Sequence, residues 1–155
     1  MKPGIKIFNS REKKKLLEEL STTYGIKQLN MDDVFLGTPK GRIYITNRDI
    51  EKLPLQKLRI NSIGLYFAMQ DRIGLRLSIE GSQILGKQAT KNILEVTDEQ
   101  AAQWFSGQDI QTESGLKGFV LVKHKQDFLG CGNLANRVLH NYLGKERRIK
   151  TLKSH

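Results

Sequence analysis

The sequence has little cysteine and little histidine, and this scarcity excludes several kinds of site. Its 155 residues include one cysteine, Cys131, which excludes an intramolecular disulfide framework and a multi-thiolate zinc site. The three histidines, His124, His140 and His155, show none of the spacings typical of metal ligands. We therefore expect no structural metal.

Long apolar runs are also missing. The longest, "GLYFAM" and "GFVLV", fall far short of the roughly 20 residues that a helix needs to cross a bilayer. The N-terminal stretch "MKPGIKIFNSREKKK" contains no apolar core of the kind found in secretory signals. The sequence thus predicts a protein that resides in the cytoplasm and binds no membrane.

No pattern in the chain matches a cofactor site or a catalytic centre. The run "GTPKGR" lacks the spacing of a phosphate-binding loop, and "GCG" lacks the third glycine of a dinucleotide fingerprint. Asp32 and Asp33 are adjacent, whereas acid/base catalysis needs two groups placed around a reacting atom. Cys131 has no partner that the sequence can name, which favours a small buried side chain over a nucleophile. We expect a binding protein that is not an enzyme and uses no cofactor.

Positive charge is concentrated at the two ends of the chain. The net charge is +10, and residues 1–60, 61–122 and 123–155 carry +6, −2 and +6. Such clustering attracts nucleic acid, acidic lipid or an acidic protein, and charge alone does not choose among them.

The first half of the chain has the pattern of mixed helix and strand. Asn9 and Glu12 have capping-box spacing, and Leu16, Leu17 and Leu20 form an apolar stripe on the helix that follows. The other elements expected here are a strand over 42–46, a short helix over 47–53, a hairpin between "IGLYFAMQ" and "GLRLSIE", and one helical turn at "SQILG".

A polar stretch, "GKQATK" at 86–91, is the expected boundary between two domains, residues 1–88 and 89–155. Beyond it the sequence predicts a strand at "NILEVT" and a helix from Asp98 through Phe105 that stops at Gly107. A hairpin is expected between "GFVLVKH" and "DFLGCG", with Gly130 and Gly132 at its turn or at a bulge. This half has the pattern of a small β-rich domain.

The C-terminal stretch "NRVLHNYLGKERRIK" combines cations, an amide and an aromatic ring. An RNA surface needs cations for phosphates, flat arginine and aromatic groups for stacking, and amides for base edges. Asn141 is the candidate reader of base edges and Tyr142 the candidate stacker. The candidate phosphate partners are Lys123, Lys125, Arg137, Lys145, Arg147, Arg148 and Lys150. The alternative is that apolar residues anchor the stretch while its charges are merely solvated.

Three segments, in this order, resemble a PUA domain, the small RNA-binding β-barrel named for pseudouridine synthases and archaeosine transglycosylases. They are "NILEVTDEQAAQWFSGQDI", "LKGFVLVKHKQDFLGCG" and "NYLGKERRI". The pattern is similar in particular to the PUA-like region of Sun-family RNA cytosine-5 methyltransferases. That region has a helix ending in W-x-x-G-x-D, an apolar strand, G-x-G and a closing N-Y-hydrophobic-x-K-x-R-R run. The matching residues are Trp104, Gly107, Asp109, Gly130, Gly132, Asn141, Tyr142, Lys145, Arg147 and Arg148.

The N-terminal half is similar to the pre-PUA domain of Nip-type ribosome-biogenesis factors. Together the resemblances imply an α+β protein in which a mixed α/β pre-PUA domain precedes a small β-barrel-like PUA domain with one or two short helices. They imply non-catalytic recognition of structured ribosomal or transfer RNA that assists RNA modification or ribosome biogenesis.

Two features depart from the family pattern. Gly144 stands where the usual proline precedes the closing lysine, and the sequence shows neither a methyltransferase domain nor the paired catalytic cysteines. The expected partners are RNA together with an RNA-modifying enzyme or a ribosome-assembly factor. The alternative function is that of a protein-interaction subunit that targets a separate RNA-modifying enzyme, such as an RNA cytosine-5 methyltransferase.

Overall fold

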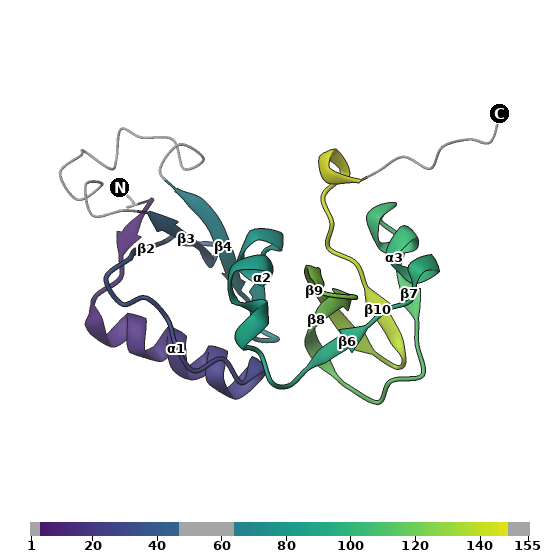
Figure 1. The fold of residues 1–155 in the computed structure, drawn as a ribbon. Coiled ribbons are helices and arrows are strands. Elements are labelled where there is room, and N and C mark those ends of the chain that lie inside the picture. The colour runs from purple at the N-terminus through teal and green to yellow at the C-terminus, as the bar shows by residue number, and fades with distance from the viewer. Residues whose placement is uncertain (1–3, 47–63, 149–155) are drawn as a thin grey trace.

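The computed structural model describes residues 4–46 and 64–148. Its elements form two five-stranded sheets, one from each half of the chain, with helices packed beside them (Figure 1). The fold is α+β, as the sequence predicts. The short helix expected over 47–53 lies outside the described residues. Within the described residues, no helix has the length and apolar character needed to cross a membrane.

The first sheet is antiparallel throughout, and its strands lie side by side in the order of the sequence. The strands are β1 (Lys6–Ile7), β2 (Val34–Gly37), β3 (Arg42–Thr46), β4 (Leu65–Gln70) and β5 (Leu75–Leu77). The structure confirms β3 and the β4–β5 hairpin. Asp71 shapes the turn of that hairpin, because its Oδ1 accepts hydrogen bonds from the backbone N–H groups of Ile73 and Gly74 at 2.8 and 3.2 Å.

Helix α1 (Ser10–Tyr24) begins where the sequence predicts. Asn9 Oδ1 accepts from the Glu12 N–H at 2.9 Å, and Glu12 Oε1 accepts from the Asn9 N–H at 2.9 Å, so the capping box is complete. The helix ends at Gly25, whose φ of 72° is the left-handed conformation that glycine adopts most readily. Leu20 and Tyr24 point into the core from one face of the helix.

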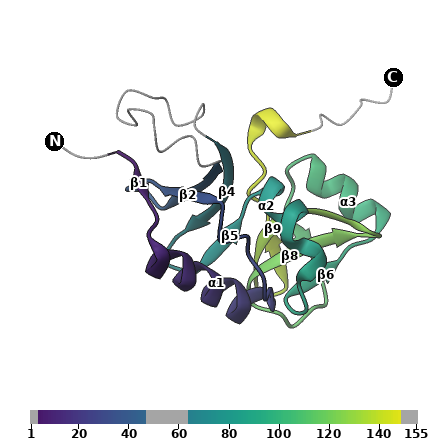
Figure 2. The same ribbon diagram turned by 60° about the vertical axis from the view of Figure 1, so that its left-hand side comes forward.

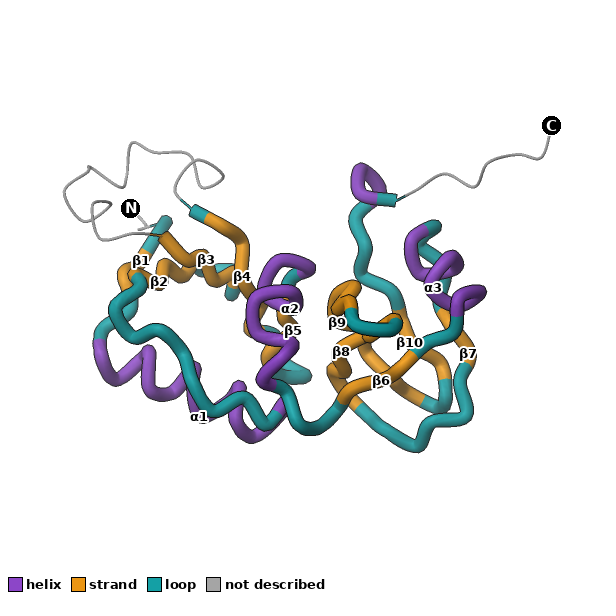
Figure 3. Tube along the Cα trace, in the orientation of Figure 1, coloured by secondary structure: helices purple, strands orange, loops and turns teal. Residues whose placement is uncertain are grey.

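The second sheet is built around one long strand, β9, which pairs with β8 on one side and β10 on the other. The strands are β6 (Ile93–Glu95), β7 (Ile110–Gln111), β8 (Gly118–His124), β9 (Asp127–Ala135) and β10 (Val138–His140), in the spatial order β6-β8-β9-β10-β7. Only the β6–β8 pair is parallel among the pairs described in this sheet. The sheet curves into a half-barrel, visible at the right of Figure 3, which confirms the predicted β-barrel-like half.

The helices of the second half and of the junction are short. They are α2 (Ile79–Leu85), the 3₁₀ helix η4 (Gly86–Gln88), α3 (Asp98–Phe105) and the 3₁₀ helix η5 (Lys145–Arg147). The bounds of α3 are those that the sequence predicts. Helix α2 is longer than the expected single turn, because Ser78 Oγ caps its start by accepting from the Gly81 N–H at 2.9 Å. The domain boundary at 88/89 stays a prediction.

One apolar core joins the two halves. Tyr24 and Leu75 from the first half belong to the same buried cluster as Leu121, Phe128 and Cys131 from the second. The Tyr24 hydroxyl donates to the Leu75 carbonyl at 2.6 Å and lies 3.3 Å from Cys131 Sγ. Burial raises the pKa of the Cys131 thiol to about 11, so it stays protonated at neutral pH and behaves as a core side chain. A second buried cluster, which includes Trp104, is made of residues from the second half.

Candidate nucleic-acid interface

The C-terminal segment after β10 is fixed against the end of α3 by Asn141. The Asn141 Nδ2 group donates to the Trp104 and Gln108 carbonyls at 2.8 and 3.0 Å, and its Oδ1 accepts from the Leu143 N–H at 2.7 Å. The backbone N–H of Asn141 donates to Asp109 Oδ1 at 2.9 Å. The polar atoms of this side chain are therefore all engaged within the protein.

Arg148 closes the same segment onto α3. Its Nε donates to the Leu143 carbonyl at 3.0 Å, and its side chain crosses Gly107, where an added Cβ would collide with it. Gly107 has a φ of 89°, which also favours glycine at this position. Asn141 and Arg148 thus hold the loop that presents η5.

Arg147 and Tyr142 connect the C-terminal segment to the first half of the chain. Arg147 Nη1 lies 3.0 Å from Glu80 Oε2, and both side chains are partly exposed. Tyr142, 40% exposed, has the Arg76 guanidinium 4.1 Å from its ring centroid and the Phe119 ring edge-on at 6.1 Å. One face of the Tyr142 ring, which is predicted to stack on a base, is therefore already covered by the Arg76 guanidinium.

A hollow of about 440 Å³ opens beside Arg147 and is termed the outer hollow. Its walls include Lys87 from the junction and Phe105 and Phe128 from the second half. Lys123 Nζ lies 5.6 Å from the centroid of the Phe128 ring, which places another cation at this surface. The structure thus brings Lys87, Lys123 and Arg147 to one region.

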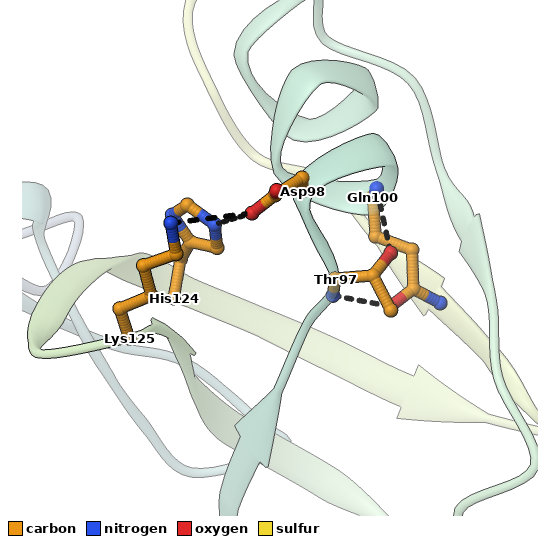
Figure 4. Close-up of polar contacts among 5 residues, drawn as sticks. All are labelled: Thr97, Asp98, Gln100, His124 and Lys125. Carbon is orange, nitrogen blue, oxygen red and sulfur yellow. Dashed lines mark hydrogen bonds and ion pairs between the residues drawn. The ribbon is translucent and has the colours of Figure 1, made fainter.

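The start of α3 holds a further cation (Figure 4). Asp98 Oδ1 lies 2.7 Å from His124 Nε2 and 3.7 Å from Lys125 Nζ. The hydrogen bond to His124, with a contribution from the Lys125 charge, lowers the pKa of the Asp98 carboxyl. Thr97 and Gln100 complete a reciprocal capping box beside them, which fixes this end of the helix. Lys125 is exposed but has a carboxylate close by.

The remaining predicted phosphate partners are Arg137, Lys145 and Lys150. Arg137 is in the β9–β10 turn at the other end of β9 from Lys125, and its Nη1 is 3.4 Å from Glu113 Oε1. Lys145 is exposed on η5, and Lys150 lies outside the described residues.

The two glycines, predicted at the turn of the hairpin or at a bulge, lie inside β9. The turn falls instead between β8 and β9, at 125–126, where Lys125 adopts a φ of 57°. Gly130 borders the register shift near Val122, and its φ is 153°. Gly132 is packed under Leu139 of β10. Both glycines therefore permit close packing along the strand.

Sequence reasoning missed the contribution of the first half to this surface. Arg42, Arg76 and Glu80 approach the C-terminal segment from β3, β5 and the start of α2. Nothing in their local sequence separates them from ordinary surface charges, because their placement depends on how the two sheets pack.

A comparison with known families gives a match in the second half of the chain. Residues 91–149 match the family described as the methyltransferase RsmF PUA domain. This part of the chain is therefore similar to a PUA domain. The likeness to the PUA-like region of Sun-family methyltransferases, inferred above from short motifs, is confirmed by this match.

Longer similarity extends into the first half. The chain is 29% identical over 146 residues to the ribosomal RNA small subunit methyltransferase F of Vibrio parahaemolyticus, covering 86% of this chain and 29% of that protein. It is 25% identical over 145 residues to the protein of the same name from Aeromonas salmonicida, covering 88% of this chain and 28% of that protein. The chain thus spans less than a third of the length of these relatives, and the PUA match accounts for only part of the similarity.

Proposed function

We propose that this chain binds structured RNA through its PUA domain, without itself carrying out the chemistry of RNA modification. The match of residues 91–149 to the PUA domain of RsmF carries the proposal. The relatives' names refer to small-subunit ribosomal RNA, which makes a ribosomal RNA helix the favoured ligand over transfer RNA. Binding would take place in the cytoplasm and would assist modification of the RNA or assembly of the ribosome.

The proposed contact surface is centred on the C-terminal segment and the outer hollow. Lys123, Lys125, Lys145 and Arg147 would bind phosphates, because they lie on the elements around this hollow. Arg137 would be an outlying contact at the far end of β9, reached only by an extended RNA helix.

Two of the predicted site residues take a different part in this proposal. Asn141 and Arg148 would position η5 rather than read bases, since Asn141 has no free polar group and Arg148 Nε is bonded to Leu143. Tyr142 would offer RNA only the part of its ring that Arg76 and Phe119 leave exposed. Shape and phosphate contacts would then dominate over reading of base edges.

Single lysine-to-glutamine variants test the surface. Lys123→Gln, Lys125→Gln and Lys145→Gln each remove one charge while the fold keeps its hydrogen-bonded framework. In fluorescence anisotropy with a ribosomal RNA hairpin, each should weaken binding and reduce the slope of log K against log salt by about 1. Lys117→Gln is the matched control, because Lys117 is an exposed lysine of the same domain in the loop between β7 and β8.

Equal effects of all four variants, the control included, would mean that charge acts without a defined surface. Absence of RNA binding by the folded protein would favour the other function, in which the basic surface meets a protein and directs a separate RNA-modifying enzyme or a ribosome-assembly factor. Co-purification of the chain with one stoichiometric protein and no RNA would be the corresponding result.

A further inference from the structure

A second cavity, of about 340 Å³, lies between the two halves of the chain and is termed the junction cavity. Its walls come from β3, β4, β5 and α2 on one side, and from α3, β9 and the C-terminal segment on the other. Figure 2 shows α2 lying against β9 at this junction, in agreement with their contacts. Small-molecule sites enclose roughly 300–1,000 Å³, so this cavity suits a ligand no larger than one nucleotide.

Two buried donors on this wall lack an acceptor within the described residues. Trp104 is 1% exposed, lines the cavity, and its indole Nε1–H has no hydrogen-bond partner there. The buried Nε–H of Arg76, which lines the same cavity, is also unpaired. Buried donors in proteins are nearly always bonded, so two unpaired ones on residues that line one cavity point to acceptors that the described residues do not supply.

Flat cationic and aromatic groups line the same space. The Arg76 guanidinium lies over the Tyr142 ring at 4.1 Å, and a guanidinium plane can stack on a nucleic-acid base in the same way. Arg42 lies 5.7 Å from the centroid of the Tyr66 ring at the cavity mouth. In the described part of the chain no carboxylate forms an ion pair with either arginine.

The charge of the lining favours an anionic ligand that also has neutral polar groups. Three arginines and two glutamates, Glu80 and Glu146, face the cavity. Arg147 is the arginine that pairs with Glu80, at 3.0 Å, so this pair bridges the two halves at the edge of the cavity. Arg42, Arg76 and Glu146 remain, so the charge left over is one positive unit.

We propose that the junction cavity binds a single nucleotide. The base would stack on the Arg76 guanidinium on the side away from Tyr142 and accept a hydrogen bond from Trp104 Nε1, while Arg42 binds the phosphate. A free mononucleotide and one nucleotide of a bound RNA strand share this chemistry. The second case rests on the proposed RNA-binding function, and the first does not.

The protein contains its own probe for this site, because Trp104 is the sole tryptophan of the sequence. Its emission is followed while cytidine monophosphate, adenosine monophosphate, cytidine or inorganic phosphate is added. Monophosphates should give a saturable change, with weaker binding of the nucleoside and of phosphate alone. Arg76→Gln should weaken monophosphate binding at least tenfold. Arg72→Gln should leave it unchanged, because Arg72 is an exposed arginine in the turn of the same hairpin, outside the cavity.

Thermal unfolding followed by circular dichroism shows which variants fold. If Arg76→Gln does not fold, Arg42→Gln provides a second variant, because Arg42 is exposed. No saturable change at millimolar monophosphate in the folded wild-type protein would overturn the proposal. Inorganic phosphate binding as tightly as the monophosphates would overturn it as well. If an RNA hairpin displaces the monophosphate, the site binds one nucleotide of an RNA strand. If the hairpin does not displace it, the site binds a free mononucleotide. Loss of RNA binding alone, with monophosphate binding retained, would reject only the proposed function.

Discussion

Replacing Asn141 by alanine separates a positioning role from a base-reading role. The substitution removes three side-chain hydrogen bonds, to Trp104 O, Gln108 O and Leu143 N. Each is worth about 0.5–1.5 kcal/mol net, and water can replace part of the bond at the exposed Gln108 carbonyl. We therefore expect a loss of about 2 kcal/mol in the free energy of unfolding, which lowers Tm by about 4–8 °C for a chain of this size.

Thermal and urea unfolding followed by circular dichroism measures this loss, and Asn141→Asp sharpens the test. Aspartate keeps the acceptor for the Leu143 N–H but brings a negative charge against the carbonyls of Trp104 and Gln108. It should destabilise the protein at least as much as alanine does at neutral pH. Unchanged stability of Asn141→Ala combined with a clear loss of RNA affinity would refute the positioning role and restore base reading.

Three further predictions follow from single positions. Gly144→Pro should stabilise the protein by about 0.4–1 kcal/mol in urea unfolding, because Gly144 already has the proline-like φ of −63°. Cys131 should resist a thiol reagent until the protein unfolds. The protonated Cys131 thiol favours the folded state, and this stabilisation is complete below the ordinary pKa of 9.0. The free energy of unfolding should therefore fall as the pH rises from 9.0 towards about 11, and Cys131→Ala should lack this part of the fall. Asp98→Asn should tighten RNA binding at low salt, because it removes the carboxylate beside Lys125; an unchanged affinity would exclude Lys125 from the interface.

Local signals predicted the elements that begin with a capping box or form a tight hairpin. The spacing of Asn9 and Glu12 located α1, and alternation around Asp71 located the β4–β5 hairpin. The strands β1 and β7 have two residues each, too few for a periodic pattern to appear in the sequence. They exist because the chain passes beside a strand that is already paired.

The candidate site was predictable only in part. The cations of the C-terminal stretch stand out by composition, but the engagement of Asn141 depends on carbonyls more than thirty residues away in the chain. The junction cavity depends on Arg76 of β5 and Trp104 of α3, which come from different halves of the chain and carry no shared motif. Contacts of this range arise from the packing of the two halves, which no short pattern encodes.

The central claim, RNA recognition by the PUA domain, is tested most directly by fluorescence anisotropy of the whole chain with a ribosomal RNA helix and with duplex DNA of matched length, each over a salt series. We expect tighter binding to the RNA at every salt concentration, with a log–log slope that corresponds to several phosphate contacts. Equal affinity for the two duplexes, or binding to neither, would contradict the account.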